Sequence, residues 1–173
     1  MQKELSRRVR NRVLAHLARA VPGATSLRPA LHRLRGVVIG ENVFIGDEVY
    51  LENEFPELIS IGNHSALGPR VMVIAHVGRT DQKEGVCGQV KIGNNVFIGA
   101  GAYILTTPGC GLTIGDGAVI GACSIINRNV REKALILPAQ SQEVGTAELA
   151  FTSARSYQAF LSYVVPLSRQ IGK

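Results

Sequence analysis

The sequence is poor in the residues that mark several common protein classes. Tryptophan is absent, aromatic residues make up 5% of the chain, and cysteine occurs three times in 173 residues. Cys87, Cys110 and Cys123 share no metal-ligand spacing, so we expect no disulfide framework and a reducing, cytoplasmic compartment. No apolar run reaches the roughly 18 residues of a membrane span. We also expect no secretory signal after Met1.

Positive charge is concentrated at one end of the chain. Residues 1–36 contain nine Lys or Arg and one Glu, a net charge of +8, whereas the remaining residues contain ten Lys or Arg and twelve Asp or Glu, a net charge of −2. The overall +6 is therefore a property of the N-terminal segment. This segment has no interleaved aromatics and no recognisable nucleic-acid motif, so we expect no nucleic-acid partner.

The basic segment 1–36 is predicted to be helical. Residues 2–20 place apolar side chains at helical spacing, and Pro22 and Gly23 end the pattern; the apolar positions are Leu5, Val9, Val13, Leu14 and Leu17. The helix either caps the open edge of the adjoining domain or lies on an anionic membrane surface. The lack of Trp and Phe in it favours the cap. His32, farther along, is expected to be a surface or capping residue.

A six-residue repeat dominates residues 37–140. Each hexad opens with a large aliphatic residue, usually followed by Gly, and has a small or β-branched residue at its fifth position, as in Val96, Ala102, Ala118, Ser124 and Val130. The opening aliphatics form four triplets: Ile39, Ile45 and Leu51; Ile61, Leu67 and Val73; Ile92, Ile98 and Ile104; Ile114, Ile120 and Ile126. A period of six fits neither a helix nor irregular loops. It fits a short strand and a turn, repeated.

Three strand-and-turn sides close a triangular coil of eighteen residues, and stacked coils share one core. Six residues separate the aliphatics within a triplet, whereas 10, 19 and 10 residues separate successive triplets. If each triplet is one coil, all three insertions fall at one corner of the prism. Insertions collected on one edge indicate that this edge carries the functional site.

Residues 141–173 follow the repeat, and from residue 146 to about 170 the apolar spacing predicts a C-terminal helix.

The segments "IGENVFIG", "IGNNVFIGAGAYIL" and "IGDGAVIGACSIINRNV" resemble the hexapeptide-repeat acyltransferases. The resemblance implies an all-β repeat fold, a left-handed parallel β-helix of about four to five coils, that assembles as a homotrimer. It also implies acetyl-CoA, or another acyl-CoA, as co-substrate and no metal. The segment from Leu51 to His76 is similar to O-acetyltransferases that act on sugars of surface polysaccharides. A hydroxyl acceptor is therefore expected ahead of an amine.

His76 is the predicted catalytic base. Transfer of an acyl group to a hydroxyl needs a group that removes the acceptor's proton, and imidazole, which titrates near neutrality, serves most often. In the resembled family one histidine does this where the long loop leaves a coil, the place of His76 in "VIAHVG". Glu52 and Asn53, one coil earlier, are candidates to bind the acceptor, and Glu48, Glu52 and Asn53 to orient the histidine.

The resemblance also implies a donor site. Small residues along the later coils would leave room for the pantetheine arm of the donor; they are Gly99, Ala100, Gly121 and Ala122. Asn127 and Arg128 stand where the family often has a phosphate-binding Thr-Lys pair.

A non-catalytic β-helix scaffold or assembly protein is the alternative function. A carbonic-anhydrase-type zinc site needs three histidines, and only His64 and His76 lie in the coils. Nothing marks Cys87 as an activated nucleophile.

Overall fold

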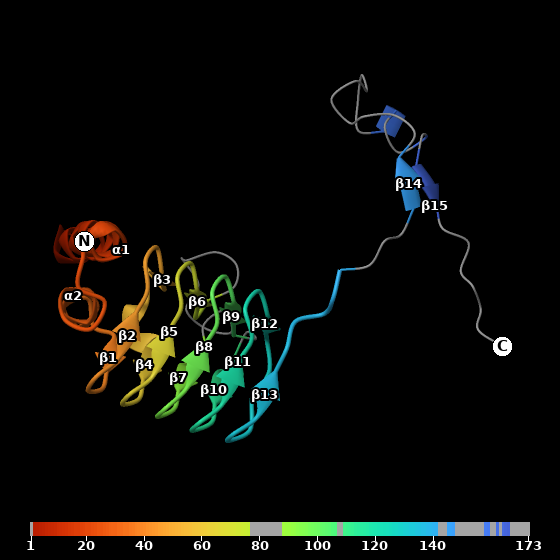
Figure 1. Ribbon diagram of the computed structural model, residues 1–173. Helices are drawn as coiled ribbons and strands as arrows, with labels where there is room; N and C mark the ends of the chain where they lie inside the picture. Colours follow the sequence, from red (N-terminus) through yellow and green to blue (C-terminus); the bar gives the residue numbers. More distant parts are fainter. Residues whose placement is uncertain are drawn as a thin grey trace. The chain divides into compact units, whose positions relative to one another are not determined.

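The computed structural model describes residues 2–76, 88–106, 109–141, 145–147, 158–159, 162 and 164–166. The chain divides into two units, Met1–Pro138 and Ala139–Lys173. Figure 1 shows the first unit as a stack of coils with two helices beside its first coil. None of the described helices is long and apolar enough to cross a membrane.

The coils form a three-sided prism of parallel strands, which confirms the expected parallel β-helix. Sheet 1 contains β1 (Val38–Ile39), β4 (Ile59–Ile61), β7 (Val90–Ile92) and β10 (Leu112–Ile114). Sheet 2 contains β2 (Phe44–Ile45), β5 (Ala66–Leu67), β8 (Phe97–Ile98), β11 (Val119–Ile120) and β13 (Leu135–Ile136). Sheet 3 contains β3 (Tyr50–Leu51), β6 (Met72–Ile74), β9 (Tyr103–Leu105) and β12 (Ile125–Ile126). Four coils are complete, and β13 belongs to a partial fifth.

The predicted register of the repeat is confirmed strand by strand. Ile61 pairs with Ile39 and Ile92 in sheet 1, and Leu67 pairs with Ile45 and Ile98 in sheet 2. In sheet 3, Val73 pairs with Leu51 and Ile104. All of these side chains are buried, as are the five small or β-branched residues named above. Because equivalent side chains stack from coil to coil, one continuous aliphatic core fills the prism.

The glycine that follows the opening aliphatic residue in most hexads is required by the neighbouring coil. A Cβ placed on Gly99 would lie 2.4 Å from the backbone nitrogen of Ala122, and one on Gly62 would lie 2.6 Å from the carbonyl carbon of Gly93. No side chain fits at such distances from a backbone. The glycine pattern is therefore explained by the spacing of the coils.

All three insertions leave the prism after a strand of sheet 3 and return before a strand of sheet 1, as predicted. We call this edge the insertion corner; it comprises the described residues 52–58, 75–76, 88–89, 106 and 109–111, with the short turn 127–129 in coil four. A 3₁₀ turn, η1 (Pro56–Leu58), lies in the first insertion.

Two helices cover the first coil. The predicted N-terminal helix is α1 (Gln2–Ala20), and α2 (Leu27–Leu34) follows it. The amide of Glu48 donates to the carbonyl of Arg19 and that of Ile45 to the carbonyl of Ala24, so strand-edge donors of coil one are satisfied by the helical segment. The segment therefore caps the prism.

The C-terminal helix predicted from residue 146 to about 170 is wrong near its two ends, whereas Gln158 and Ala159 inside the predicted range are helical. Gly145–Ala147 forms β14 and Val164–Pro166 forms β15, and the two pair antiparallel. The β-branched pair Val164 and Val165 favours an extended chain, and Pro166 cannot donate within a helix. Residues 148–157, in the middle of the predicted helix, lie outside the described part.

Candidate active site

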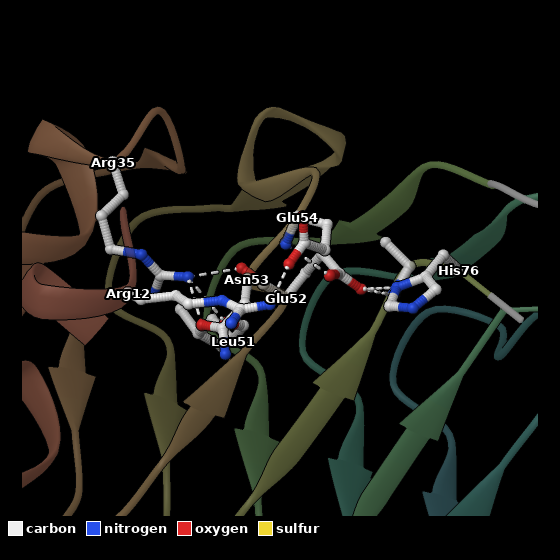
Figure 2. Close-up of polar contacts among 8 residues, drawn as sticks. Arg12, Arg35, Leu51, Glu52, Asn53, Glu54 and His76 are labelled. Carbon is white, nitrogen blue, oxygen red and sulfur yellow. Dashed lines mark hydrogen bonds and ion pairs between the residues drawn. The ribbon is translucent and has the colours of Figure 1, made fainter. Parts of the chain in front are cut away.

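His76 and Glu52 meet at the insertion corner. Glu52 follows β3 in coil one and His76 follows β6 in coil two, so stacking of the coils brings their side chains together (Figure 2). The Nδ1 atom of His76 lies 2.6 Å from Oε2 of Glu52. The Glu52 side chain is fully buried, whereas that of His76 is 20% exposed. The imidazole therefore has one side held in the protein and another that reaches the surface.

Both oxygens of Glu52 accept further hydrogen bonds. The amide of Ala75 donates to Oε2 over 3.1 Å and the amide of Glu54 donates to Oε1 over 2.9 Å. This set of donors suits an ionised carboxylate, which accepts at both oxygens. We accordingly assign the Nδ1–H tautomer to His76, with Nδ1 as donor to Glu52 and a lone pair on Nε2. Such a histidine can take a proton at Nε2, and Glu52 would stabilise the resulting imidazolium.

An aromatic side chain fixes the histidine ring from another direction. The rings of Phe55 and His76 are 6.1 Å apart between centroids and inclined at 75°, an edge-to-face arrangement. Phe55 is buried and comes from the same insertion as Glu52. The first insertion thus supplies both the Glu52 carboxylate and the Phe55 ring, and the two contacts restrict rotation of the imidazole.

Arg35 holds the segment that carries Glu52. Its guanidinium is buried and donates to the carbonyl of Leu51 over 3.1 Å, to the carbonyl of Glu52 over 2.5 Å and to Oδ1 of Asn53 over 2.9 Å (Figure 2). Burial lowers the pKa of Arg35 to about 10. A planar guanidinium with several donors can satisfy such a cluster of oxygens where an ammonium could not.

The expectation that His32 is a surface residue is wrong. Its side chain is 1% exposed, and Nδ1 lies 2.9 Å from the Nη1 atom of Arg35. Burial, and secondarily the charge of Arg35, lowers the pKa of His32 to about 3, so the ring is neutral and accepts from Arg35. His32 therefore belongs to the support behind Glu52, although its sequence context shows only a helix with other basic residues.

The two residues predicted to bind the acceptor have internal partners. Glu52 has no exposed surface, and the oxygen of Asn53 accepts from Arg35. Of the two roles considered for Glu52, the geometry favours orientation of His76. Glu48, the other candidate to orient His76, instead pairs with Arg70.

Glu54 links the same insertion to α1. Arg12 donates to Glu54 over 2.8 Å, and Arg8 lies 3.6 Å from the same carboxylate. The first insertion, with Glu54 and Phe55, could be predicted from the sequence as one wall of an acceptor pocket. The role of Arg35 and the contacts of Glu54 and Phe55 could not, because no motif or spacing ties these residues to a histidine in another coil.

The structure separates the predicted donor residues into two groups. Asn127 and Arg128 follow β12 at the insertion corner, the same edge as His76. The four small residues, Gly99, Ala100, Gly121 and Ala122, lie where the chain passes from sheet 2 to sheet 3. At that corner a groove of about 570 Å³ is lined by Ala100 among others. Within one chain, sheet 3 therefore separates Asn127 and Arg128 from the four small residues.

Other candidates lie away from His76 or outside the described residues. His64 lies in an exposed turn with a positive φ of 56°. Cys87 and the polar loop residues 79–84 fall in the segment that is not described. Within the described ranges, no group of three His, Cys, Asp or Glu residues could hold a metal ion.

Comparisons with known proteins match this chain to acetyltransferases with the same repeat. Residues 89–128 match the family described as the hexapeptide repeat of succinyl-transferase. A Bacillus subtilis protein named "Putative acetyltransferase YvoF" is 28% identical over 128 residues, which cover 74% of this chain and 71% of that protein. Two further curated relatives are matched over only 44% and 27% of their own lengths.

The resemblance inferred from the hexads is confirmed. Residues 89–128 carry the hexapeptide repeat, and the chain is similar to hexapeptide-repeat acetyltransferases. A galactoside acetyltransferase in complex with coenzyme A has the same fold, with a TM-score of 0.54 and 23% identity over 79% of this chain and 78% of that one. A hexapeptide-repeat acetyltransferase of Vibrio cholerae, complexed with acetyl coenzyme A, has a TM-score of 0.52 and 20% identity over 76% and 82% of the two chains. At these identities the two structures support the fold alone.

Proposed function

We propose that this protein transfers an acetyl group from acetyl-CoA to a hydroxyl of a sugar or similar small acceptor, with His76 as general base. The observation that carries the proposal is the Glu52–His76 pair, in which a buried carboxylate orients a partly exposed imidazole. Acetyl transfer itself is supported by the acetyltransferase relatives. The sugar acceptor rests on the similarity of the segment from Leu51 to His76 to sugar O-acetyltransferases.

The reaction would proceed by direct attack in a ternary complex. The acceptor oxygen bonds to the thioester carbonyl carbon while Nε2 of His76 takes the hydroxyl proton. Collapse of the tetrahedral intermediate breaks the carbon–sulfur bond, and the imidazolium returns the proton to the thiolate of coenzyme A. Glu52 stays ionised throughout and stabilises the imidazolium. No residue of the enzyme is acylated in this scheme.

We propose that the donor extends along the insertion corner from His76 toward Arg128. The turn that holds Arg128 lies two coils beyond the strand that precedes His76, which corresponds to about 10 Å along the prism at the usual strand spacing. Arg128 is exposed and can bind a phosphate in bidentate fashion. Arg131 and Lys133 are exposed nearby in the chain and add positive charge.

A homotrimer is the assembly that we propose. The outer face of sheet 2 presents Phe44, Phe97, Val119 and Leu135, and that of sheet 3 presents Tyr103 and Ile125, all more than a third exposed. In coils two to four of sheet 1, Ser60, Lys91 and Thr113 occupy the equivalent outward positions. Two apolar faces that share an edge suit a closed three-fold ring in which sheet 2 of one prism packs on sheet 3 of the next.

Calorimetric titration with coenzyme A and acetyl-CoA tests the proposal without knowledge of the acceptor. We expect binding with a dissociation constant of about 1 μM to 1 mM, weakened by Arg128→Ala and retained in His76→Ala. An acceptor screen should then find turnover that His76→Ala abolishes. If a folded protein binds neither ligand, the scaffold alternative becomes the better explanation of the fold.

A further inference from the structure

The outward face of α1 carries an apolar stripe that the described residues leave uncovered. Leu5, Val9, Val13 and Leu17 are 63%, 55%, 53% and 46% exposed. The helix packs on the rest of the unit through its opposite face, where Asn11, Ala15 and Ala18 are almost fully buried. Small residues thus face the protein and the larger apolar residues face away, the reverse of an ordinary capping helix.

The spacing of the stripe fits a flat surface better than a second helix. Its members are four residues apart, so at about 100° per residue each step turns about 40° around the helix. The four side chains therefore spread over about 120° of the helix surface. A partner helix would need a narrow seam that repeats every 3.5 residues on average. The exposed polar residues Ser6 and His16 lie within the same arc. A broad and mainly apolar face suits an extended apolar layer.

Arginines border the stripe on both sides. On the same geometry, Arg10 lies about 20° beyond Leu17 and Arg12 lies about 20° beyond Leu5. Both side chains are exposed, and Arg12 remains 67% exposed although it pairs with Glu54. Cationic side chains flanking an apolar face match the boundary between acyl chains and anionic headgroups.

We propose that α1 binds in the plane of an anionic lipid membrane, with the stripe in the acyl boundary and Arg10 and Arg12 at the lipid phosphates. The helix need not leave the prism to do so, because its buried face lies away from the stripe. Arg8 still lies 3.6 Å from Glu54 when Arg12, 2.8 Å from that carboxylate, exchanges it for a lipid phosphate. Because Val and Leu line the stripe in place of Trp or Phe, binding depends on the charge of the lipid. The proposal is independent of the acyl-transfer activity.

Vesicle flotation of the full-length protein tests this surface. The two probes are pure phosphatidylcholine vesicles and vesicles that also contain about 30 mol% phosphatidylglycerol. We expect binding to the anionic vesicles alone, reversed by high salt. Val9→Glu should weaken it about tenfold or more, since it places a charge in the acyl boundary. Val38→Glu is the matched control, because Val38 is 63% exposed but lies on sheet 1.

Three outcomes would overturn the proposal. The first is a folded protein that does not float with anionic vesicles, and the second is equal flotation of the Val9→Glu and Val38→Glu proteins. The third is a change of oligomeric state in Val9→Glu, measured by light scattering, which would show that the stripe lies between copies of this chain. Thermal melts of each variant establish that the substitutions at these exposed positions leave the fold intact.

Discussion

Glu52 Oε2 lies 2.6 Å from Nδ1 of His76, although 24 residues separate the two in the sequence. The contact arises because Leu51 and Val73 are paired neighbours in sheet 3, and Glu52 and His76 follow these two residues closely in the chain. The repeat therefore positions the candidate base and its carboxylate without any local motif.

Replacing Glu52 with Gln should lower kcat with little change in KM for acetyl-CoA. An amide can turn its NH₂ group toward Nδ1, which favours the tautomer with hydrogen on Nε2 and removes the acceptor for the substrate proton. We expect a loss of about 10²–10⁴ in kcat. Steady-state kinetics with the acceptor found by screening measure it.

His76→Ala and a thermal melt are the controls for Glu52→Gln. The two variants should have similar residual rates, because groups that act as a unit are not additive. A Glu52→Gln enzyme that is folded and fully active would show that the carboxylate has no part in the reaction.

Arg35→Met should destabilise the protein and lower kcat together. The substitution leaves the carbonyls of Leu51 and Glu52 and the Asn53 oxygen without their shared donor. Unsatisfied buried acceptors cost about 1–3 kcal/mol each in the free energy of unfolding. Denaturant titration and kcat are measured on the same preparation.

Arg33→Met is the matched control, since Arg33 lies on α2 and also donates to two carbonyls, those of Ile39 and Gly40, but is itself exposed. It should lower the free energy of unfolding by less than about 1 kcal/mol. Equal effects of the two substitutions would contradict a special role for Arg35 behind Glu52.

The prism could be predicted from the sequence, because each stacked aliphatic must recur at a fixed interval. The longer intervals between triplets predicted the insertion corner, and they also predicted that His76 lies there. The support of the site could not be predicted, because Arg35 and His32 act through backbone carbonyls and burial. The outward stripe of α1 was equally hidden, since helical spacing identifies an apolar face but not the direction in which it points.

Stability should depend on pH through His32. Its pKa is lowered from 6.5 to about 3 in the folded protein. Between these values the unfolded chain binds the proton and the folded protein does not, so the stabilising effect of a neutral His32 is complete above about pH 6.5 and declines as pH falls through this window. The slope is about 1.4 kcal/mol per pH unit for one proton.

His32→Gln should flatten this pH dependence, because the amide oxygen can still accept from Arg35 and has no proton to gain. Denaturant titrations of both proteins from pH 4 to pH 7 measure the difference. His64→Gln serves as the reference, since His64 is exposed. Parallel curves for wild type and His32→Gln would show that another group causes the acid loss.

Phe97→Glu should convert the proposed trimer to monomers. Phe97 is 51% exposed in the middle of sheet 2, and a carboxylate buried between apolar faces would be unpaired. Light scattering coupled to size-exclusion chromatography measures the mass. Thr113→Glu, an exposed position on sheet 1, should leave the mass unchanged. A wild-type monomer, or a trimeric Phe97→Glu protein, would refute this arrangement.

Gly99→Ala should destabilise the protein more than Gly121→Ala. The added methyl on Gly99 would meet the backbone of Ala122 at 2.4 Å, whereas at Gly121 the nearest atoms are at 3.1 Å and include the ring of Pro138. Backbone in the middle of the stack cannot move without shifting a whole coil, so we expect a loss of about 2–4 kcal/mol for Gly99→Ala and about 1 kcal/mol for Gly121→Ala. Calorimetric titration with coenzyme A on the folded fraction then separates packing from donor binding. Unchanged affinity in a variant would assign that glycine to the packing of the coils alone, whereas a selective loss of affinity would place it in the donor site.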